Sequence, residues 1–256
     1  MKKIFTILLT GILSACNVNV ANSQNNNSST LSTDITKMSA VNIYGFVSVI
    51  DTVDGSDTPI EEASDNVKKI NSLKLSIYDK NTKKELESFE LNKVDTRTKG
   101  EILRFEGGFK GIKSGEYNFK VMFRDDKNNI VSEKEKELKI SEKKIYELES
   151  YLKQTSIKRD SKGTINTDIQ LIEKKEDSFV KDQMIIGFKK EIDENKAREL
   201  ITKMGIKIKE IQKGALKYYN VTFEGVNLYE ALIKANKDEN VEYVEPNGIV
   251  TIQKLF

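Results

Sequence analysis

Apolar and polar residues alternate along most of the stretch between residues 41 and 171, which is the pattern of half-buried β-strands. The clearest case is residues 117–123, where every second side chain is apolar or aromatic. A polar turn separates this segment from residues 130–140, so we predict a β-hairpin there. The other predicted strands are residues 41–50, 73–77, 86–91, 101–105, 145–152 and 165–171.

Short strands at this spacing, joined by polar turns, are typical of an antiparallel sandwich, which we predict for residues 41–172. Pro59 lies in a polar, acidic loop that we expect at residues 51–66. The segment from Ser114 to Tyr117 resembles the start of an immunoglobulin-like F strand, where a Tyr forms a corner. Packing in the core explains the aromatic residues of this region, and such a sandwich does not by itself indicate a function.

Residues 178–256 follow a different pattern, with two helical stripes among four short strands. Asp193 is a candidate N-cap for the first helix and Gly205 its candidate stop. Asn227 begins the second helix, with Glu230 three residues later in a spacing similar to a capping box. The two stripes at helical spacing are Ala197, Leu200, Ile201 and Met204, and then Leu228, Ala231, Leu232 and Ala235. The predicted strands are residues 184–188, 206–211, 218–223 and 241–245.

The order strand-helix-strand-strand-helix-strand predicts a ferredoxin-like unit with both helices on one face of its sheet. The other face stays open and carries residues such as Tyr218 and Asn220, or their immediate neighbours, since the pattern leaves the register open by one residue. The predicted fold class is therefore α+β with two domains, an immunoglobulin-like antiparallel β-sandwich followed by a ferredoxin-like domain.

Residues 1–15 have the features of a secretory signal, with Lys2 and Lys3 before an apolar run that is too short to span a membrane. The run ends in Leu13-Ser14-Ala15-Cys16, which resembles the lipobox of bacterial lipoproteins. That resemblance implies cleavage before Cys16 and acylation of this residue. The alternative is an ordinary signal peptide with a chance Cys.

Residues 16–40 are rich in Asn, Ser and Thr, and we expect a flexible tether that holds the domains away from the membrane. Asn17 follows Cys16, and by the lipoprotein sorting rule this resembles an outer-membrane signal if the source is Gram-negative. The expected location is the bacterial cell envelope, with a lipid anchor in the membrane.

The amino-acid composition excludes several classes of function. The 256 residues include no His and one Cys, and the 42 Lys and Arg nearly balance the 40 Asp and Glu. Without His there is no imidazole base or metal ligand, and a single Cys makes neither a disulfide within the chain nor a thiolate cluster. The near-neutral charge gives no basic field for nucleic acid. We therefore expect no enzyme, no cofactor and no nucleic-acid partner.

The last third of the chain resembles the N-terminal propeptide domain of subtilisin-like serine proteases, particularly the fervidolysin type. The matching segments are residues 184–189, 197–205, 219–221 and 228–235, and the strongest marker is Val241-Glu242-Tyr243-Val244-Glu245-Pro246-Asn247. In the proteases a catalytic domain with an Asp/His/Ser triad follows. Since this sequence has no His, we expect it to act as a stand-alone propeptide.

The resemblance implies that the open sheet face packs on two surface helices of a protease. Tyr243 is a predicted contact, and Glu245 and Asn247 match two positions that cap the N-termini of those helices. The family often has acids at both positions, so the neutral Asn247 is a departure. The alternative is that Glu245 and Asn247 simply end a strand.

The family's C-terminal tail lies in the protease cleft like a product, as an added strand. One register places Val250 at P4, Ile252 at P2 and Gln253 at P1. The other places Phe256 at P1, where a large apolar pocket suits it. The remaining possibility is that residues 248–252 extend the last strand.

These observations predict a membrane-anchored lipoprotein that acts in trans as a propeptide-like inhibitor or folding assistant of a subtilisin-like serine protease. The alternative is a non-enzymatic envelope binding protein, in which the sandwich binds the partner and the C-terminal domain is a scaffold. A weaker third hypothesis is an enzyme that uses an acid/base pair among Asp125, Asp126 and Glu133. Acids in such clusters are usually solvated turn residues.

Overall fold

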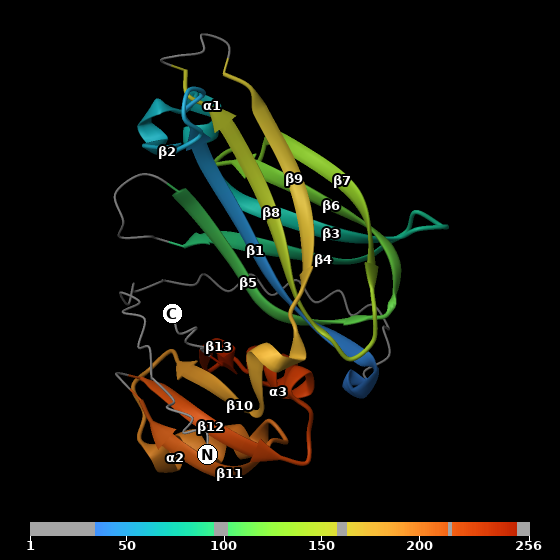
Figure 1. Cartoon of the computed structure of the whole chain (residues 1–256), viewed down its shortest axis with the longest axis vertical. Coiled ribbons are helices and arrows are strands. Elements are labelled where there is room, and N and C mark those ends of the chain that lie inside the picture. Colours follow the sequence, from blue (N-terminus) through green and yellow to red (C-terminus); the bar gives the residue numbers. More distant parts are fainter. Residues whose placement is uncertain (1–33, 95–101, 158–162, 215–216, 250–256) are drawn as a thin grey trace, which may run out of the picture.

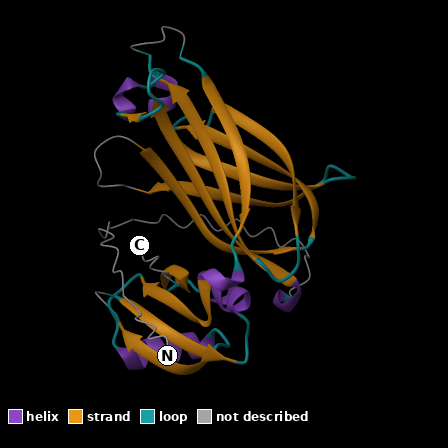
Figure 2. Cartoon of the chain, in the orientation of Figure 1, coloured by secondary structure: helices purple, strands orange, loops and turns teal. Residues whose placement is uncertain are grey.

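The computed structural model describes residues 34–94, 102–157, 163–214 and 217–249. Strands make up most of this part of the chain and form two sheets, a large one above a small one in Figure 1. Figure 2 shows the helices gathered at the upper end of the large sheet and around the small sheet.

Most predicted strands are present, and several are longer than the pattern indicates. The strands of the large sheet are β1 Met38–Ile50, β2 Asp57–Thr58, β3 Ile70–Asp79, β4 Glu85–Val94, β5 Ile102–Lys113, β6 Gly115–Asp125, β7 Ile130–Ile140, β8 Ile145–Thr155 and β9 Ile165–Glu173. The strands of the small sheet are β10 Phe179–Phe188, β11 Lys207–Lys213, β12 Tyr218–Glu224 and β13 Val241–Gly248.

The described residues form three α-helices, α1 Asp65–Lys68, α2 Glu194–Lys203 and α3 Leu228–Lys237. Three short 3-10 helices accompany them, η1 Ile35–Lys37, η2 Ile60–Glu62 and η3 Glu176–Ser178. Asp193 caps α2 as predicted, because its side chain accepts a hydrogen bond from the Lys196 amide at 2.8 Å. Within the described residues no helix has the length and apolarity needed to cross a membrane.

The large sheet follows one continuous path, β7-β6-β3-β4-β5-β1-β8-β9, with β2 paired to β1. The predicted hairpin is confirmed as the antiparallel pair β6–β7, and β8–β9 form a second antiparallel pair. Strand β1 lies antiparallel to β5 but parallel to β8. The link between β4 and β5 is short, with Lys93 opposite Phe105 and Val94 opposite Arg104.

The large sheet curls until its edge strands β7 and β9 approach each other. The hydroxyls of Ser132 and Thr167 lie 2.7 Å apart, and the Lys136 ammonium donates to the Ile169 carbonyl at 2.8 Å. Lys136 also pairs with Asp168 at 3.1 Å. These contacts give the edge strands side-chain partners, and a row of alternating Glu and Lys on β7 keeps that edge polar.

The curl encloses an apolar core, to which inward-facing residues of nearly every strand contribute, among them Val41, Leu75, Phe105, Phe123 and Leu148. At one end, α1 closes this core with Val67, which is completely buried. The buried amide of Gln154 accepts a hydrogen bond from the Ser64 amide at 2.9 Å and so holds this segment against β8.

The small sheet has the strand order β11-β12-β10-β13. Met184, Ile186 and Phe188 of β10 pack with α2 and α3 on one face, together with Val221 and Phe223 of β12. Residues at the alternate positions of these strands lie on the opposite face, which we call the open face.

Helix α3 lies between the two sheets, because it contacts β10 and β13 on one side and β1 and β5 on the other. Glycines of β5 allow α3 to lie close to the large sheet. A Cβ on Gly111 would lie 3.3 Å from Ile233, and one on Gly108, which has φ of 65°, would lie 2.2 Å from the Asn236 side chain. The core of the small sheet therefore includes residues of the large sheet, namely Met38, Ala40 and Phe109.

The predicted fold class is wrong. The chain is mostly β, and the large sheet is one hydrogen-bonded path with a parallel β1–β8 pair rather than an immunoglobulin-like antiparallel sandwich. The small sheet does not form a separate ferredoxin-like domain, since α3 buries residues of both sheets in one core. Tyr117 does donate to the Lys113 carbonyl at 3.1 Å, but this local corner is compatible with many β folds.

Candidate interaction surface

The open face of the small sheet carries the predicted contacts that fall within the described residues. Register places Tyr218 and Tyr243 opposite Gly187, and Asn220 and Glu245 opposite Ile185. The sequence pattern left open whether Tyr218 and Asn220 or their neighbours occupy this face. The structure places Tyr218 and Asn220 there, because Tyr219 and Val221 are completely buried under the helices. The five non-glycine residues of this face are half-buried, namely Tyr218, Asn220, Tyr243, Glu245 and Ile185.

Gly187 lets two aromatic rings meet on this face. Strand β10 separates β12 from β13, yet the Tyr218 and Tyr243 rings pack edge to face with centroids 6.1 Å apart and planes at 82°. A Cβ on Gly187 would lie 2.6 Å from Cε1 of Tyr218. The missing side chain therefore creates the space in which Tyr218 crosses the strand, as aromatic residues do over a strand glycine.

Glu245 is held in place by its neighbour on the same face. The Tyr243 hydroxyl donates a hydrogen bond to the Glu245 carboxylate. Burial raises the pKa of Tyr243, and the hydrogen bond to the carboxylate raises it further, so Tyr243 stays a protonated donor at neutral pH. The arrangement orients a carboxylate on a half-buried aromatic surface.

Asn247 lies further along β13, and its side-chain amide donates to the Gln183 side chain at 2.8 Å. The strand ends at Gly248, and the backbone amide of Ile249 donates to the Ser178 carbonyl at 2.8 Å. Pairing therefore continues beyond Asn247 as far as Ile249.

Five of the predicted site residues lie outside the described residues. They are the lipidation residue Cys16 and the tail residues Val250, Ile252, Gln253 and Phe256. Their roles stay predictions.

No sequence pattern placed a residue of the large sheet beside this face. Strand β13 contacts β5, and β5 carries the salt bridge of Arg104 and Glu106 at 2.6 Å. Burial raises the pKa of Tyr44 on β1 to about 12, with the Glu106 charge as the next cause and Glu245 contributing from the small sheet. The sequence did contain a signal for Gly187, because an isolated Gly in a strand marks the close approach of another group. No sequence pattern pointed to Tyr44 or Glu106.

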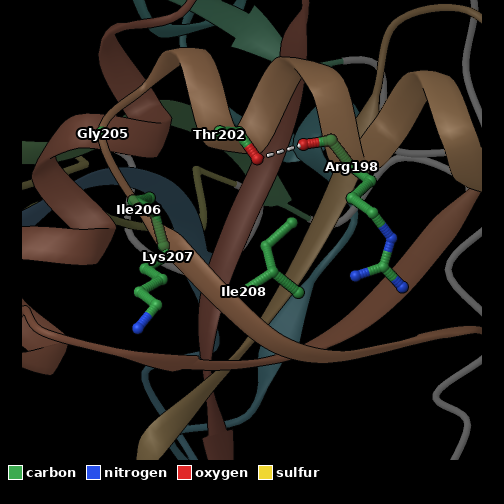
Figure 3. A pocket seen from close by; sticks show the side chains of 6 residues that line it. All are labelled: Arg198, Thr202, Gly205, Ile206, Lys207 and Ile208. Carbon is green, nitrogen blue, oxygen red and sulfur yellow. Dashed lines mark hydrogen bonds between the residues drawn. The ribbon is translucent and has the colours of Figure 1, made fainter.

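A separate hollow of about 380 Å³ lies between α2 and β11 (Figure 3). Its lining residues are Arg198, Thr202, Gly205, Ile206, Lys207 and Ile208. The Thr202 hydroxyl donates to the Arg198 carbonyl at 2.8 Å, and the Arg198 guanidinium pairs with Glu194 at 3.1 Å. None of the predicted site residues lines this hollow.

One family model and one solved structure match this chain. No curated protein matches the chain. A leucine-rich repeat protein from Bacteroides thetaiotaomicron shares 7% identity, with a TM-score of 0.25 over 75% of this chain and 21% of that protein. Residues 165–247 match the family model described as the fervidolysin N-terminal prodomain, a stretch that runs from the first residue of β9 to Asn247. This part of the chain is therefore similar to a subtilase propeptide.

Proposed function

We propose that this protein is a membrane-anchored lipoprotein of the bacterial cell envelope that binds a subtilisin-like serine protease in trans, as a propeptide-like inhibitor or folding assistant. The observation that carries the proposal is the match of residues 165–247 to a protease prodomain. The matched region contains the whole open face of the small sheet, on which the predicted contacts Tyr243, Glu245 and Asn247 lie.

The open face has the chemistry of a protein interface. Aromatic side chains are enriched at the centres of such interfaces, and Tyr218 and Tyr243 provide two of them side by side. The Glu245 carboxylate, oriented by Tyr243, is suited to the N-terminus of a helix, where backbone N–H groups lack partners and the dipole favours negative charge. Asn247 offers an amide oxygen there instead of a charge.

The principal test measures binding and inhibition with the full chain. We expect the protein to inhibit subtilisin, and Glu245→Gln to weaken the inhibition by about tenfold, because a charged hydrogen-bond acceptor is replaced by a neutral one. Glu199→Gln on α2 is the matched control, because it makes the same change on the helix-covered side of the small sheet. Absence of complex formation with subtilisin and with other mature subtilases would refute the proposal.

A second assay separates inhibitor from folding assistant. A folding assistant stabilises the native protease by binding it rather than its unfolded chain. It therefore raises the yield of active protease when a denatured subtilase without its own propeptide is refolded. An inhibitor that is not an assistant lowers the activity of mature protease and leaves that yield unchanged.

The tail is tested by removing residues 250–256, which follow the last hydrogen bond of Ile249 and so should leave the sheet intact. We expect the loss of cleft binding to weaken inhibition strongly. Mass spectrometry of the intact protein after incubation separates the two registers. Loss of residues 254–256 supports Gln253 at P1, and an intact C-terminus with tight inhibition supports Phe256 at P1.

The anchor is tested at Cys16. We expect Cys16→Ser to abolish acyl labelling and to leave the protein as a precursor or in the soluble fraction, since the acyl chains supply the membrane affinity. Unchanged labelling and fractionation of this variant would exclude Cys16 as the lipidation site.

A further inference from the structure

A row of aromatic rings crosses the face of the large sheet that points away from its core, which we call the outer face. Tyr44 and Phe46 of β1 alternate with the buried Ile43 and Val47, so their rings point outward. The rings of Tyr44 and Phe46 stack with centroids 6.2 Å apart, and Phe46 stacks on Tyr151 of β8 at 5.3 Å. We call these three residues the aromatic ladder.

The ladder belongs to neither apolar core. Tyr44, Phe46 and Tyr151 are half-buried and are absent both from the core of the large sheet and from the core around α3. Aromatic rings gathered outside a core are candidate contacts for a partner, because aromatic side chains are enriched at the centres of protein interfaces.

Cations lie at both ends of the ladder. The Arg104 guanidinium lies 5.4 Å from the Tyr44 centroid, and the Lys153 ammonium lies 5.3 Å from the Tyr151 centroid. Arg104 also pairs with Glu106. Aromatic residues together with Arg are the side chains most enriched among those that dominate the binding energy of protein interfaces.

The ladder is continuous with the open face of the small sheet. Strand β13, which carries Tyr243, contacts β5, which carries Glu106. Glu106 lies directly opposite Tyr44 in the β1–β5 pairing, and after burial its charge is the next cause of the raised pKa of Tyr44. Strand β5 therefore pairs with β1 beside Tyr44 and contacts β13 of the small sheet, which places the two faces side by side.

We propose that the aromatic ladder is the second half of the protease-binding surface, so that a subtilisin-like protease seated on Tyr218, Tyr243 and Glu245 also packs against Phe46 and Tyr151 of the large sheet. This inference rests on the proposed function. Because the two faces are continuous, we assign the aromatic ladder to the same partner as the open face. A protease large enough to cover the small sheet reaches across β13 to β5 and β1.

The large sheet then has a role in recognition that a propeptide domain alone does not provide. The added contacts lie outside the region that matches the prodomain family, since β1 and β8 precede residue 165. They would distinguish this protein's partner from proteases that bind an isolated propeptide.

The test measures the dissociation constant of the full-length protein, without its lipid anchor, for subtilisin blocked at its catalytic serine. We expect Phe46→Ala and Tyr151→Ala each to weaken binding by about tenfold, as truncation of a central aromatic contact does. Tyr78→Ala is the matched control, because this half-buried Tyr on β3 hydrogen-bonds to Glu85 at 3.1 Å and belongs to the other half of the large sheet. We expect its affinity to stay within about twofold of the wild type.

Failure of the inference and failure of the proposed function have different signatures. If Tyr243→Ala weakens binding and Phe46→Ala and Tyr151→Ala do not, the ladder is not part of the surface and the proposed function stands. If the unmodified protein does not bind, the proposed function fails and the inference fails with it.

Hydroxyl-radical footprinting gives a readout that needs no variant. We expect the complex to protect Tyr44, Phe46 and Tyr151 from oxidation and to leave Tyr78 reactive, and equal reactivity of Phe46 in both states would overturn the proposal.

Discussion

Tyr218 and Tyr243 pack edge to face across Gly187, although their strands are not neighbours in the small sheet. The contact exists because β10 has no side chain at the position between them. The shape of the open face therefore depends on a glycine, through the side chain that it lacks.

We predict that Gly187→Ala reshapes the open face without unfolding the protein. The new methyl group would lie 2.6 Å from Tyr218, so the ring must move away from Tyr243. We expect a loss of about 1–3 kcal/mol in the free energy of unfolding, as for overpacking elsewhere, and weaker binding of subtilisin. Urea denaturation and a binding titration check the two effects. An unchanged affinity in the folded variant would show that the Tyr218–Tyr243 contact is not part of the interface.

A second prediction concerns alkaline pH. Burial raises the pKa of Tyr44 and Tyr151 to about 12, with Glu106 and the hydrogen bond to Glu149 as the next causes. In the unfolded chain these groups ionise near pH 10. The folded protein therefore keeps protons that the unfolded chain loses, so this stabilisation is fully present below about pH 10 and is lost as the pH rises through about 12.

Ultraviolet titration of tyrosinate checks this prediction. Between about pH 10 and 12 we expect the folded protein to ionise fewer tyrosines than the protein in urea, and the free energy of unfolding to fall. Tyr243→Phe should change this signal little, because burial and the hydrogen bond to Glu245 raise the pKa of Tyr243. Coincident folded and unfolded titration curves would contradict the raised pKa values of Tyr44 and Tyr151.

A third prediction is that Ile233→Ala destabilises both sheets together. Ile233 is completely buried on α3 and lies against Gly111 of the large sheet. We expect a loss of about 2–5 kcal/mol, from the lost burial and the cavity that remains. Hydrogen exchange should report weaker protection in β1 as well as in β10. Val53→Ala serves as the control, since Val53 is 75% exposed, and a loss of protection confined to β10 would show that the two sheets unfold independently.

A fourth prediction concerns the start of α2. Asp193→Ala removes the hydrogen bond to the Lys196 amide and should cost about 0.5–2 kcal/mol in the free energy of unfolding. Asp193→Ser keeps an acceptor at the N-cap and should recover most of that loss. Thermal and urea denaturation of the two variants provide the comparison, and equal stability of the two would show that the cap contributes nothing.

Local features of this protein could be predicted from its sequence. The alternation at residues 117–123 and 130–140 predicted the β6–β7 hairpin, because side chains of a strand point alternately to the two faces and one face is apolar. The stripe behind Asp193 predicted α2, with its cap. The open face of the small sheet was also predicted, but its register was left open between Tyr218 and Tyr219, which differ little in polarity.

Only the tertiary structure decided how these elements come together. The parallel pairing of β1 with β8 joins residues such as Val41 and Tyr146, and no local pattern specifies which of several similar strands will be the neighbour. The sequence pattern likewise shows that α3 has apolar residues, but not that Ile233 and Asn236 fit against glycines of β5 and join the two sheets through one core. The contact of β13 with β5 accompanies that packing. Contacts between residues far apart in the chain depend on the shapes of whole faces, whereas alternation and caps depend on a few adjacent residues.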